Sequence, residues 1–166
     1  MRRLHVPVRL RWSDVDAYGH VNNAEMFRLL EEARIQAFWA PDLAPGLREP
    51  AEPGEGASET TRVLAGGADA DTLSFIAKHT IEYLTPIPYM SEPIDVQLWL
   101  GRLGGASLDV CYEAHPPRGL PEPVYVRAST TIVLVDAATR RPRRLTQRER
   151  AAWGPYLGDP VTFNRH

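Results

Sequence analysis

The chain has 166 residues, and its 19 basic and 21 acidic side chains give a formal net charge of −2 at pH 7. This near balance leaves no global field that would attract nucleic acid or an anionic membrane, so we expect neither as a partner. The single cysteine, Cys111, excludes an internal disulfide and a cysteine-rich metal centre, and we expect neither a metal nor a cofactor. No apolar run approaches the roughly 20 residues of a membrane span, so we expect a cytoplasmic protein. The length of the chain fits one domain over residues 1–166.

The first predicted element is a strand. From Val6 to Trp12 every second side chain is apolar, with Val8 and Leu10 between these two. Alternation of this kind is typical of a strand that buries one face, so we expect these side chains to point into the core. A polar turn over residues 13–22 follows the strand.

The pattern after the turn is helical. Asn22 is a suitable N-cap, and Glu25 stands at the spacing of a capping box. Apolar residues then recur at helical spacing and fill much of the remaining circumference: Met26, Phe27, Leu29, Leu30, Ala33, Ile35, Ala37, Phe38 and Trp39. A helix with so much apolar surface needs cover on several sides, so we expect a sheet to wrap around it.

The second half of the chain predicts a sheet. Residues 40–71 contain several prolines and glycines and few large apolar side chains, which indicates a variable loop. Four alternating segments follow, at residues 75–83, 94–100, 108–114 and 125–135. A tight turn at residues 104–105 and the other short connections favour antiparallel pairing. The capping-box spacing of Thr146 and Glu149 predicts a short C-terminal helix over residues 146–156.

Together these elements predict an α+β fold in which the sheet packs around one long central helix. A sheet of this kind keeps two open edges. We expect the strands around Val6 and Ile132 to pair across a two-fold axis, so a dimer is a natural expectation.

The residues most informative about chemistry lie between the first strand and the helix. A helix N-terminus presents unpaired N–H groups and a partial positive charge, which can polarise a carbonyl and hold a developing oxyanion. Asp16 lies shortly before that end, where a carboxylate can act as nucleophile or as general base on a water. The alternative is that Asp16 only caps the helix or stabilises the turn.

Several strings in the sequence resemble a known family. DAYGHVNN at residues 16–23, followed by EEAR at residues 31–34, resembles the signature of the 4-hydroxybenzoyl-CoA thioesterase-like branch of the hotdog-fold thioesterases. RWSDVD at residues 11–16 is also similar to plant acyl-ACP thioesterases. The similarity extends to IEYLTP at residues 81–86, GGAS at residues 104–107 and VLVD at residues 133–136.

This resemblance implies a hotdog fold, with an antiparallel sheet of five or six strands around one long helix. It implies a homodimer or dimer of dimers that joins the sheets and forms an acyl groove at the interface. It also implies hydrolysis of an acyl-CoA or acyl-carrier-protein thioester, with Asp16 as the catalytic carboxylate and the backbone N–H of Asn23 as donor to the carbonyl. The benzoyl-specific enzymes carry an aromatic residue at the position of Asn23, which argues against hydroxybenzoyl-CoA as the substrate.

Other residues of the signature turn are candidate substrate contacts, each with a simpler interpretation. Gly19 permits either a positive φ or a close approach of substrate. His20 and Val21 can line the substrate site, and His20 can instead orient Asp16 or satisfy backbone groups of the turn. Asn22 serves as a helix cap or as a ligand.

Candidate contacts to the coenzyme lie further along the chain. Lys78 and Arg102 can meet the phosphates of coenzyme A, and Ser107 can contact pantetheine. Each of them is otherwise a plain turn or surface residue. Glu31 and Glu32 can reach the groove, or they can form exposed ion pairs with the arginines of the same helix.

Two other functions remain open at this point. A hotdog hydratase or dehydratase would act on an enoyl thioester through a histidine with an acidic partner, and His20 is the histidine nearest the signature. A non-catalytic acyl-CoA-binding protein would keep the fold and the interface. Asp16 argues against the second alternative, because a pure binder gains little from an anion beside a carbonyl.

Overall fold

The computed structural model describes residues 2–40, 61–120 and 123–164. Its strands are β1 (Leu4–Val8), β2 (Thr72–Tyr83), β3 (Ile94–Leu103), β4 (Ser107–His115) and β5 (Val126–Asp136). Its helices are α1 (Asn23–Phe38) and α2 (Gln147–Trp153), and two short 3-10 turns are η1 (Trp12–Asp14) and η3 (Gly154–Tyr156). Most of the predicted loop over residues 40–71 lies outside the described residues.

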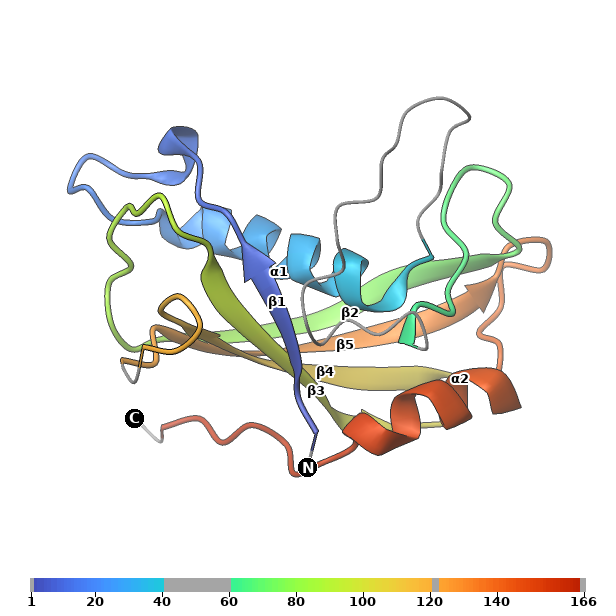
Figure 1. Cartoon of the computed structure of the whole chain (residues 1–166). Coiled ribbons are helices and arrows are strands. Elements are labelled where there is room, and N and C mark those ends of the chain that lie inside the picture. The colour runs from blue at the N-terminus through green and yellow to red at the C-terminus, as the bar shows by residue number, and fades with distance from the viewer. Residues whose placement is uncertain (1, 41–60, 121–122, 165–166) are drawn as a thin grey trace.

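The strands form one antiparallel sheet in the order β1-β3-β4-β5-β2. The long helix α1 crosses one face of this sheet (Figure 1), and α2 lies at one end of the same core, where Trp153 contacts Phe38 of α1. The predicted α+β class, the antiparallel pairing and the β3–β4 turn at residues 104–105 are confirmed. No helix within the described ranges is both long enough and apolar enough to cross a membrane.

The main core lies between α1 and the face of the sheet that it covers. Successive side chains of a strand point to opposite faces of the sheet, and this face carries Leu98, Val110 and Ile132. None of these three side chains has exposed surface. From α1, Met26 and Leu30 pack against them and are each 1% exposed. The helix is therefore held by the apolar stripe that its spacing predicted.

Two large apolar side chains of α1 are only partly covered within the described chain. Phe27 and Ile35 are 36% and 48% exposed, although their apolar character had suggested burial. Phe27 lies against the ring of His79 on β2, with 5.3 Å between the ring centroids, and Ile35 lines a hollow together with Pro7 and Val8 of β1. Exposed apolar side chains on an otherwise buried helix mark a surface that another molecule can cover.

The first strand is shorter than predicted. β1 ends at Val8, and Trp12 lies in η1 with 76% of its surface exposed, against the expectation that it would join the core. The buried carboxylate of Asp14 accepts a hydrogen bond of 2.7 Å from the backbone N–H of Arg11, which starts the turn. The indole of Trp12 packs edge-on against Tyr89, with ring centroids 5.1 Å apart. The apolar alternation in the sequence therefore extends beyond the end of β1, because the hydrogen bonds of Asp14 form a 3-10 turn there.

The two predicted capping boxes have different outcomes. Asn22 caps α1 by accepting from the N–H of Ala24 at 2.8 Å, but Glu25 forms no return bond and lies 3.8 Å from Arg28 instead. At α2, Thr146 and Glu149 form the complete box. The segment predicted as one helix over residues 146–156 consists of α2 followed by η3.

The expected pairing around Val6 and Ile132 is wrong for Ile132. β5 lies between β4 and β2 and is hydrogen-bonded on both sides, so it has no free edge. The long outer strand is β2, where Phe75, Ile76 and Tyr83 are 50%, 39% and 46% exposed. The edge with exposed apolar side chains is therefore that of β2.

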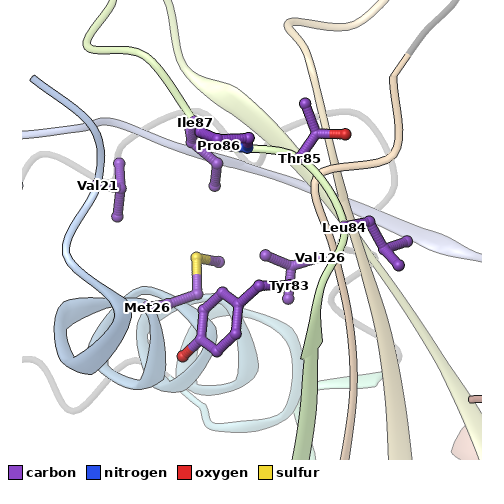
Figure 2. A pocket seen from close by; sticks show the side chains of 8 residues that line it. All are labelled: Val21, Met26, Tyr83, Leu84, Thr85, Pro86, Ile87 and Val126. Carbon is purple, nitrogen blue, oxygen red and sulfur yellow. The ribbon is translucent and has the colours of Figure 1, made fainter. Parts of the chain in front are cut away.

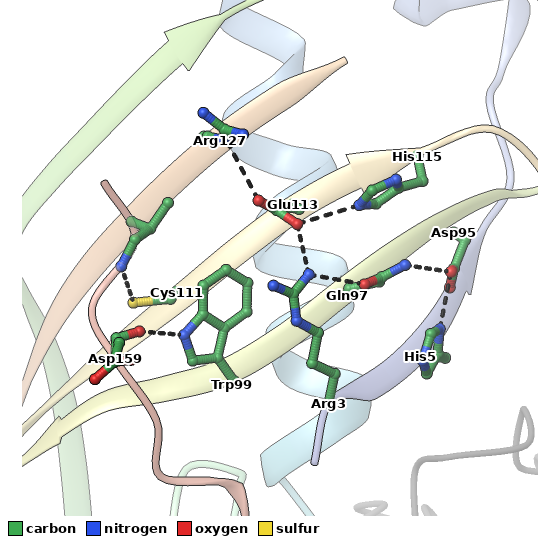
Figure 3. Close-up of polar contacts among 11 residues, drawn as sticks. Arg3, His5, Asp95, Gln97, Trp99, Cys111, Glu113, His115, Arg127 and Asp159 are labelled. Carbon is green, nitrogen blue, oxygen red and sulfur yellow. Dashed lines mark hydrogen bonds and ion pairs between the residues drawn. The ribbon is translucent and has the colours of Figure 1, made fainter. Parts of the chain in front are cut away.

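The opposite face of the sheet carries a polar network (Figure 3). Glu113 accepts hydrogen bonds from Arg3 and from Arg127, and it lies 3.3 Å from Nε2 of His115. These contacts, led by His115, hold the pKa of Glu113 at about 2, below its usual value of 4.5. The buried thiol of Cys111 lies on this same face.

Candidate active site

The turn before α1 is held closed by backbone contacts. Val15 and Val21 form an isolated antiparallel bridge, and the N–H of Asn22 donates to the carbonyl of Asp14 at 2.8 Å. The side chain of Asp14 is fully buried. The signature turn over residues 14–22 is therefore a compact loop, with its tip projecting ahead of the helix.

Asp16 occupies this loop with one oxygen engaged. Its Oδ1 accepts from the backbone N–H of Tyr18 at 2.8 Å and from that of His20 at 3.2 Å. No residue in the described part of the chain donates to Oδ2. The carboxylate is thus oriented by the turn and keeps one oxygen available for a reacting carbonyl or a water. The same two bonds also stabilise the turn, as the simpler interpretation requires.

Gly19 has the positive φ that its type and position suggested. Its φ is +80°, and a Cβ placed there would meet nothing within 4 Å. The cost of another residue here would come from backbone strain, since the space is open. His20 forms a bridge with Pro88, and its ring contacts no described hydrogen-bonding partner.

The start of α1 keeps a free donor. The N–H of Ala24 is occupied by the side-chain oxygens of Asn22 and Asn23, at 2.8 and 3.0 Å. The N–H of Asn23 meets no acceptor among the residues that the structure describes. As the first residue of the helix, Asn23 has its N–H at the positive end of the helix dipole. This donor can bind an anionic or polarised oxygen.

A mostly apolar pocket of about 200 Å³ lies against this end of the helix. Its lining residues are Val21, Met26, Tyr83, Leu84, Thr85, Pro86, Ile87 and Val126 (Figure 2). The hydroxyl of Tyr83 donates to the carbonyl of Asn23 at 2.6 Å, and the N–H of Val21 donates to the carbonyl of Ile87 at 2.9 Å. Partial burial raises the pKa of Tyr83 above its usual value of 10.0, so this hydroxyl keeps its proton at neutral pH. These bonds fix the pocket to the signature turn and to the first turn of α1.

The predicted coenzyme contacts lie elsewhere in this chain. Arg102 and Ser107 flank the β3–β4 turn, where Arg102 donates to Asp109 at 2.7 Å and to the hydroxyl of Ser107 at 3.3 Å. Since β3 begins beside Val8 and runs away from it, that turn is at the end of the sheet opposite the signature turn. Lys78 is an exposed residue in the middle of β2. Within one chain, none of the three joins Asp16 and Asn23.

Sequence reasoning missed two features. Tyr83 was part of an alternating strand, but no local pattern indicates that its hydroxyl reaches Asn23 across 60 residues of sequence. Arg34 was grouped with exposed helix charges, whereas it is 3% exposed. Its position four residues after Leu30 on the buried stripe was the available signal. Within the described ranges, no three His, Cys, Asp or Glu side chains gather as metal ligands would.

Comparison with known proteins is consistent with this arrangement. The sequence profile of the thioesterase-like superfamily matches residues 10–153, and the chain belongs to that family. A predicted thioesterase from Bacillus stearothermophilus has 20% identity and a TM-score of 0.68 over 96% of this chain and 100% of its own. A thioesterase candidate from Pseudomonas aeruginosa has 27% identity and a TM-score of 0.64, covering 92% and 97%. No curated protein matches the sequence.

A 1,4-dihydroxy-2-naphthoyl-CoA thioesterase from Synechocystis shares the fold, with 15% identity and a TM-score of 0.63 over 92% of this chain and 96% of its own. The predicted hotdog fold and the predicted family are confirmed by these matches. The family is thereby established at the level of thioesterase-like proteins.

Proposed function

We propose that the protein is a cytoplasmic thioesterase that hydrolyses an acyl-CoA or acyl-carrier-protein thioester to the free acid and the thiol. The observation that supports this most directly is the N–H of Asn23 at the start of α1, which meets no acceptor among the described residues and lies beside a mostly apolar pocket. In a chain of the thioesterase-like superfamily, this pairing offers one donor for a carbonyl oxygen and one space for an acyl chain.

The proposed reaction uses few groups. The thioester carbonyl oxygen accepts from the N–H of Asn23, and the positive end of α1 stabilises the negative charge that develops on that oxygen. Oδ2 of Asp16 either attacks the carbonyl carbon or takes a proton from the attacking water. The carbon–sulfur bond then breaks, the thiolate leaves with the electron pair, and it is protonated from solvent. Water supplies the oxygen of the acid, and in the nucleophilic route it hydrolyses the acyl-aspartate.

We further propose that two copies pair through their β2 edges. Phe75 and Ile76 are exposed on this outer strand, and Phe27 of α1, which packs beside β2, is partly exposed. Pairing would cover the open strand edge and Phe27 together. Light scattering after size-exclusion chromatography tests this, with Ile76→Glu expected to shift the dimer toward monomer. A monomeric wild-type protein would contradict it.

A thiol-release assay over short, medium, long and aromatic acyl-CoAs tests the proposed hydrolysis. We expect release of free thiol from at least one class, at a rate well above the blank. The rival hydratase predicts that the ultraviolet absorbance of enoyl-CoA falls without release of thiol. The non-catalytic rival predicts tight acyl-CoA binding with no turnover in the whole panel.

A further inference from the structure

A hollow of about 340 Å³ lies beside the edge strand β1, on the face of the sheet that carries the polar network (Figure 3). We call it the β1 hollow, and it is larger than the pocket of about 200 Å³ beside the start of α1. Pro7, Pro93 and Pro117 form part of its wall, and its polar lining includes His5 and Asp95. Because β1 and β2 are the two outer strands of the sheet, the proposed pairing through β2 leaves this hollow open.

The hydrogen bonds around Asp95 have fixed donors and acceptors. A guanidinium can only donate, so Oε1 of Gln97 accepts from Arg3 at 2.9 Å. The amide nitrogen of Gln97 then donates to Oδ2 of Asp95 at 3.2 Å. The same oxygen of Asp95, which is 6% exposed, lies 2.8 Å from Nδ1 of His5 (Figure 3). The buried carboxylate is thus held between an amide and an imidazole.

This arrangement sets the tautomer of His5. An ionised carboxylate can only accept, so Nδ1 of His5 carries a hydrogen and donates it to Asp95. In the neutral ring, Nε2 is then an acceptor. No described residue donates to Nε2, and the side chain of His5 is 29% exposed, so a molecule in the β1 hollow can reach it. His5 therefore presents one oriented acceptor to the hollow.

The charges of the lining favour a neutral ligand. The β1 hollow contains two carboxylates, those of Glu92 and Asp95, and one guanidinium, that of Arg118. It therefore offers no excess of positive charge to an anion. Each carboxylate already accepts a side-chain hydrogen bond, Glu92 from the hydroxyl of Ser91 at 2.9 Å, which weakens its attraction for a cation. A neutral molecule with an apolar body and one hydrogen-bond donor matches the proline wall and the open acceptor.

We propose that the β1 hollow is a binding site for a small neutral molecule of the phenol class, whose hydroxyl donates to Nε2 of His5. Small-molecule sites are mostly apolar, and a few placed polar groups give them specificity. An acceptor already oriented by Asp95 and Gln97 needs little ordering when it binds such a hydroxyl. The site is separate from the pocket beside Asn23, so the inference does not depend on the proposed hydrolysis.

The test compares phenol with toluene, in which a methyl group replaces the hydroxyl, by NMR titration of the whole chain. For ligands this small we expect dissociation constants of about 1 mM, with shifts at the residues of the β1 hollow. His5→Phe should change the ratio of the two dissociation constants by at least about fivefold against phenol, the factor of one neutral hydrogen bond. His79→Phe, at a histidine outside the hollow, is the matched control and should leave the ratio unchanged.

Two further measurements keep the inference testable if His5→Phe does not fold. The amide of His5→Gln can donate to Asp95 and still present an oxygen, so this variant should keep part of the wild-type ratio. Nitrogen-15 NMR at about pH 8, where an ordinary imidazole is neutral, should find the hydrogen of His5 on Nδ1.

Several results would overturn the inference. Phenol that shifts no residue of the β1 hollow at about ten times the expected dissociation constant is one of them, and a ratio unchanged in His5→Phe is another. Tighter binding of benzoate or benzylamine than of phenol would assign the hollow to a charged ligand instead. A hydrogen on Nε2 of the neutral ring would remove the acceptor on which the proposal depends.

Discussion

The hydroxyl of Tyr83 donates a hydrogen bond of 2.6 Å to the backbone carbonyl of Asn23, and this bond joins the end of β2 to the first residue of α1. Asn23 is also the residue whose N–H meets no acceptor among the described residues, and we propose this N–H as the donor to the thioester carbonyl. The wall of the pocket and the proposed oxyanion donor are thus held by one contact. The position of the donor depends on a strand 60 residues away in the sequence.

Replacing Tyr83 by Phe removes this bond and keeps the ring. We expect a loss of at most about 1 kcal/mol in the free energy of unfolding, because water can reach the released carbonyl. We expect a larger effect on hydrolysis, a roughly tenfold fall in kcat/KM, because small displacements of a positioned donor are expensive in rate. Urea unfolding and thiol release measure the two effects. An equal, small change in both would remove the positioning role.

A proline at position 23 isolates the backbone donor. Proline is favoured as the first residue of a helix, where it removes an N–H that the helix does not use. The preceding residue, Asn22, already has the extended backbone that proline requires, with φ −62° and ψ 137°. Asn23→Pro should therefore fold normally and lose about 10²- to 10³-fold in kcat, whereas Asn23→Ala should stay within about threefold of the wild type. Equal rates for the two variants would exclude the N–H as the oxyanion donor.

The network on the outer face predicts acid sensitivity. In the folded protein the pKa of Glu113 is about 2, against a usual value of 4.5, chiefly because of the hydrogen bond with His115. A depressed pKa stabilises the fold above the unfolded-state value, and this stabilisation is lost as the pH falls from about 5 toward 2. Glu113→Gln should flatten the dependence of unfolding free energy on pH in that window, by at most about 3 kcal/mol. Asp69→Asn, at an exposed carboxylate, is the control and should leave the slope unchanged.

The C-terminal helix closes one end of the core through Trp153. Its ring is fully buried, lies 5.8 Å from that of Phe38, and donates from Nε1 to the carbonyl of Thr61 at 3.0 Å. Trp153→Ala should cost about 3–5 kcal/mol in the free energy of unfolding, because it leaves a large cavity. The exposed Trp12 offers a matched control, and Trp12→Ala should cost less than about 1 kcal/mol. Similar losses in the two variants would contradict this role of Trp153.

The regular part of the fold could be predicted from local patterns. Strands β2 to β5 follow apolar alternation, and α1 and α2 follow helical spacing with recognisable caps. The same rule failed at Trp12, because alternation does not reveal that Asp14 ends the strand and starts a 3-10 turn. Strand order also escaped local reasoning, since the position of β5 inside the sheet depends on contacts between distant segments.

The candidate site was predictable where its residues are contiguous in sequence. Residues 16–23 form one loop and the start of one helix, so the signature identified Asp16 and Asn23 as parts of one continuous segment. The contact of Tyr83 with Asn23 and the burial of Arg34 could not be found in this way. They depend on strand register and on the burial of a charge, which appear only when the helix is packed on the sheet.

The most direct test of the proposed mechanism is thiol release by Asp16→Asn, run beside the wild type on the acyl-CoA that the wild type prefers. The amide oxygen of Asn can still accept from the N–H groups of Tyr18 and His20, so the turn should be preserved. We expect a normal unfolding transition and a fall in kcat of about a hundredfold or more. A variant that folds and hydrolyses the thioester at the wild-type rate would remove Asp16 from the reaction.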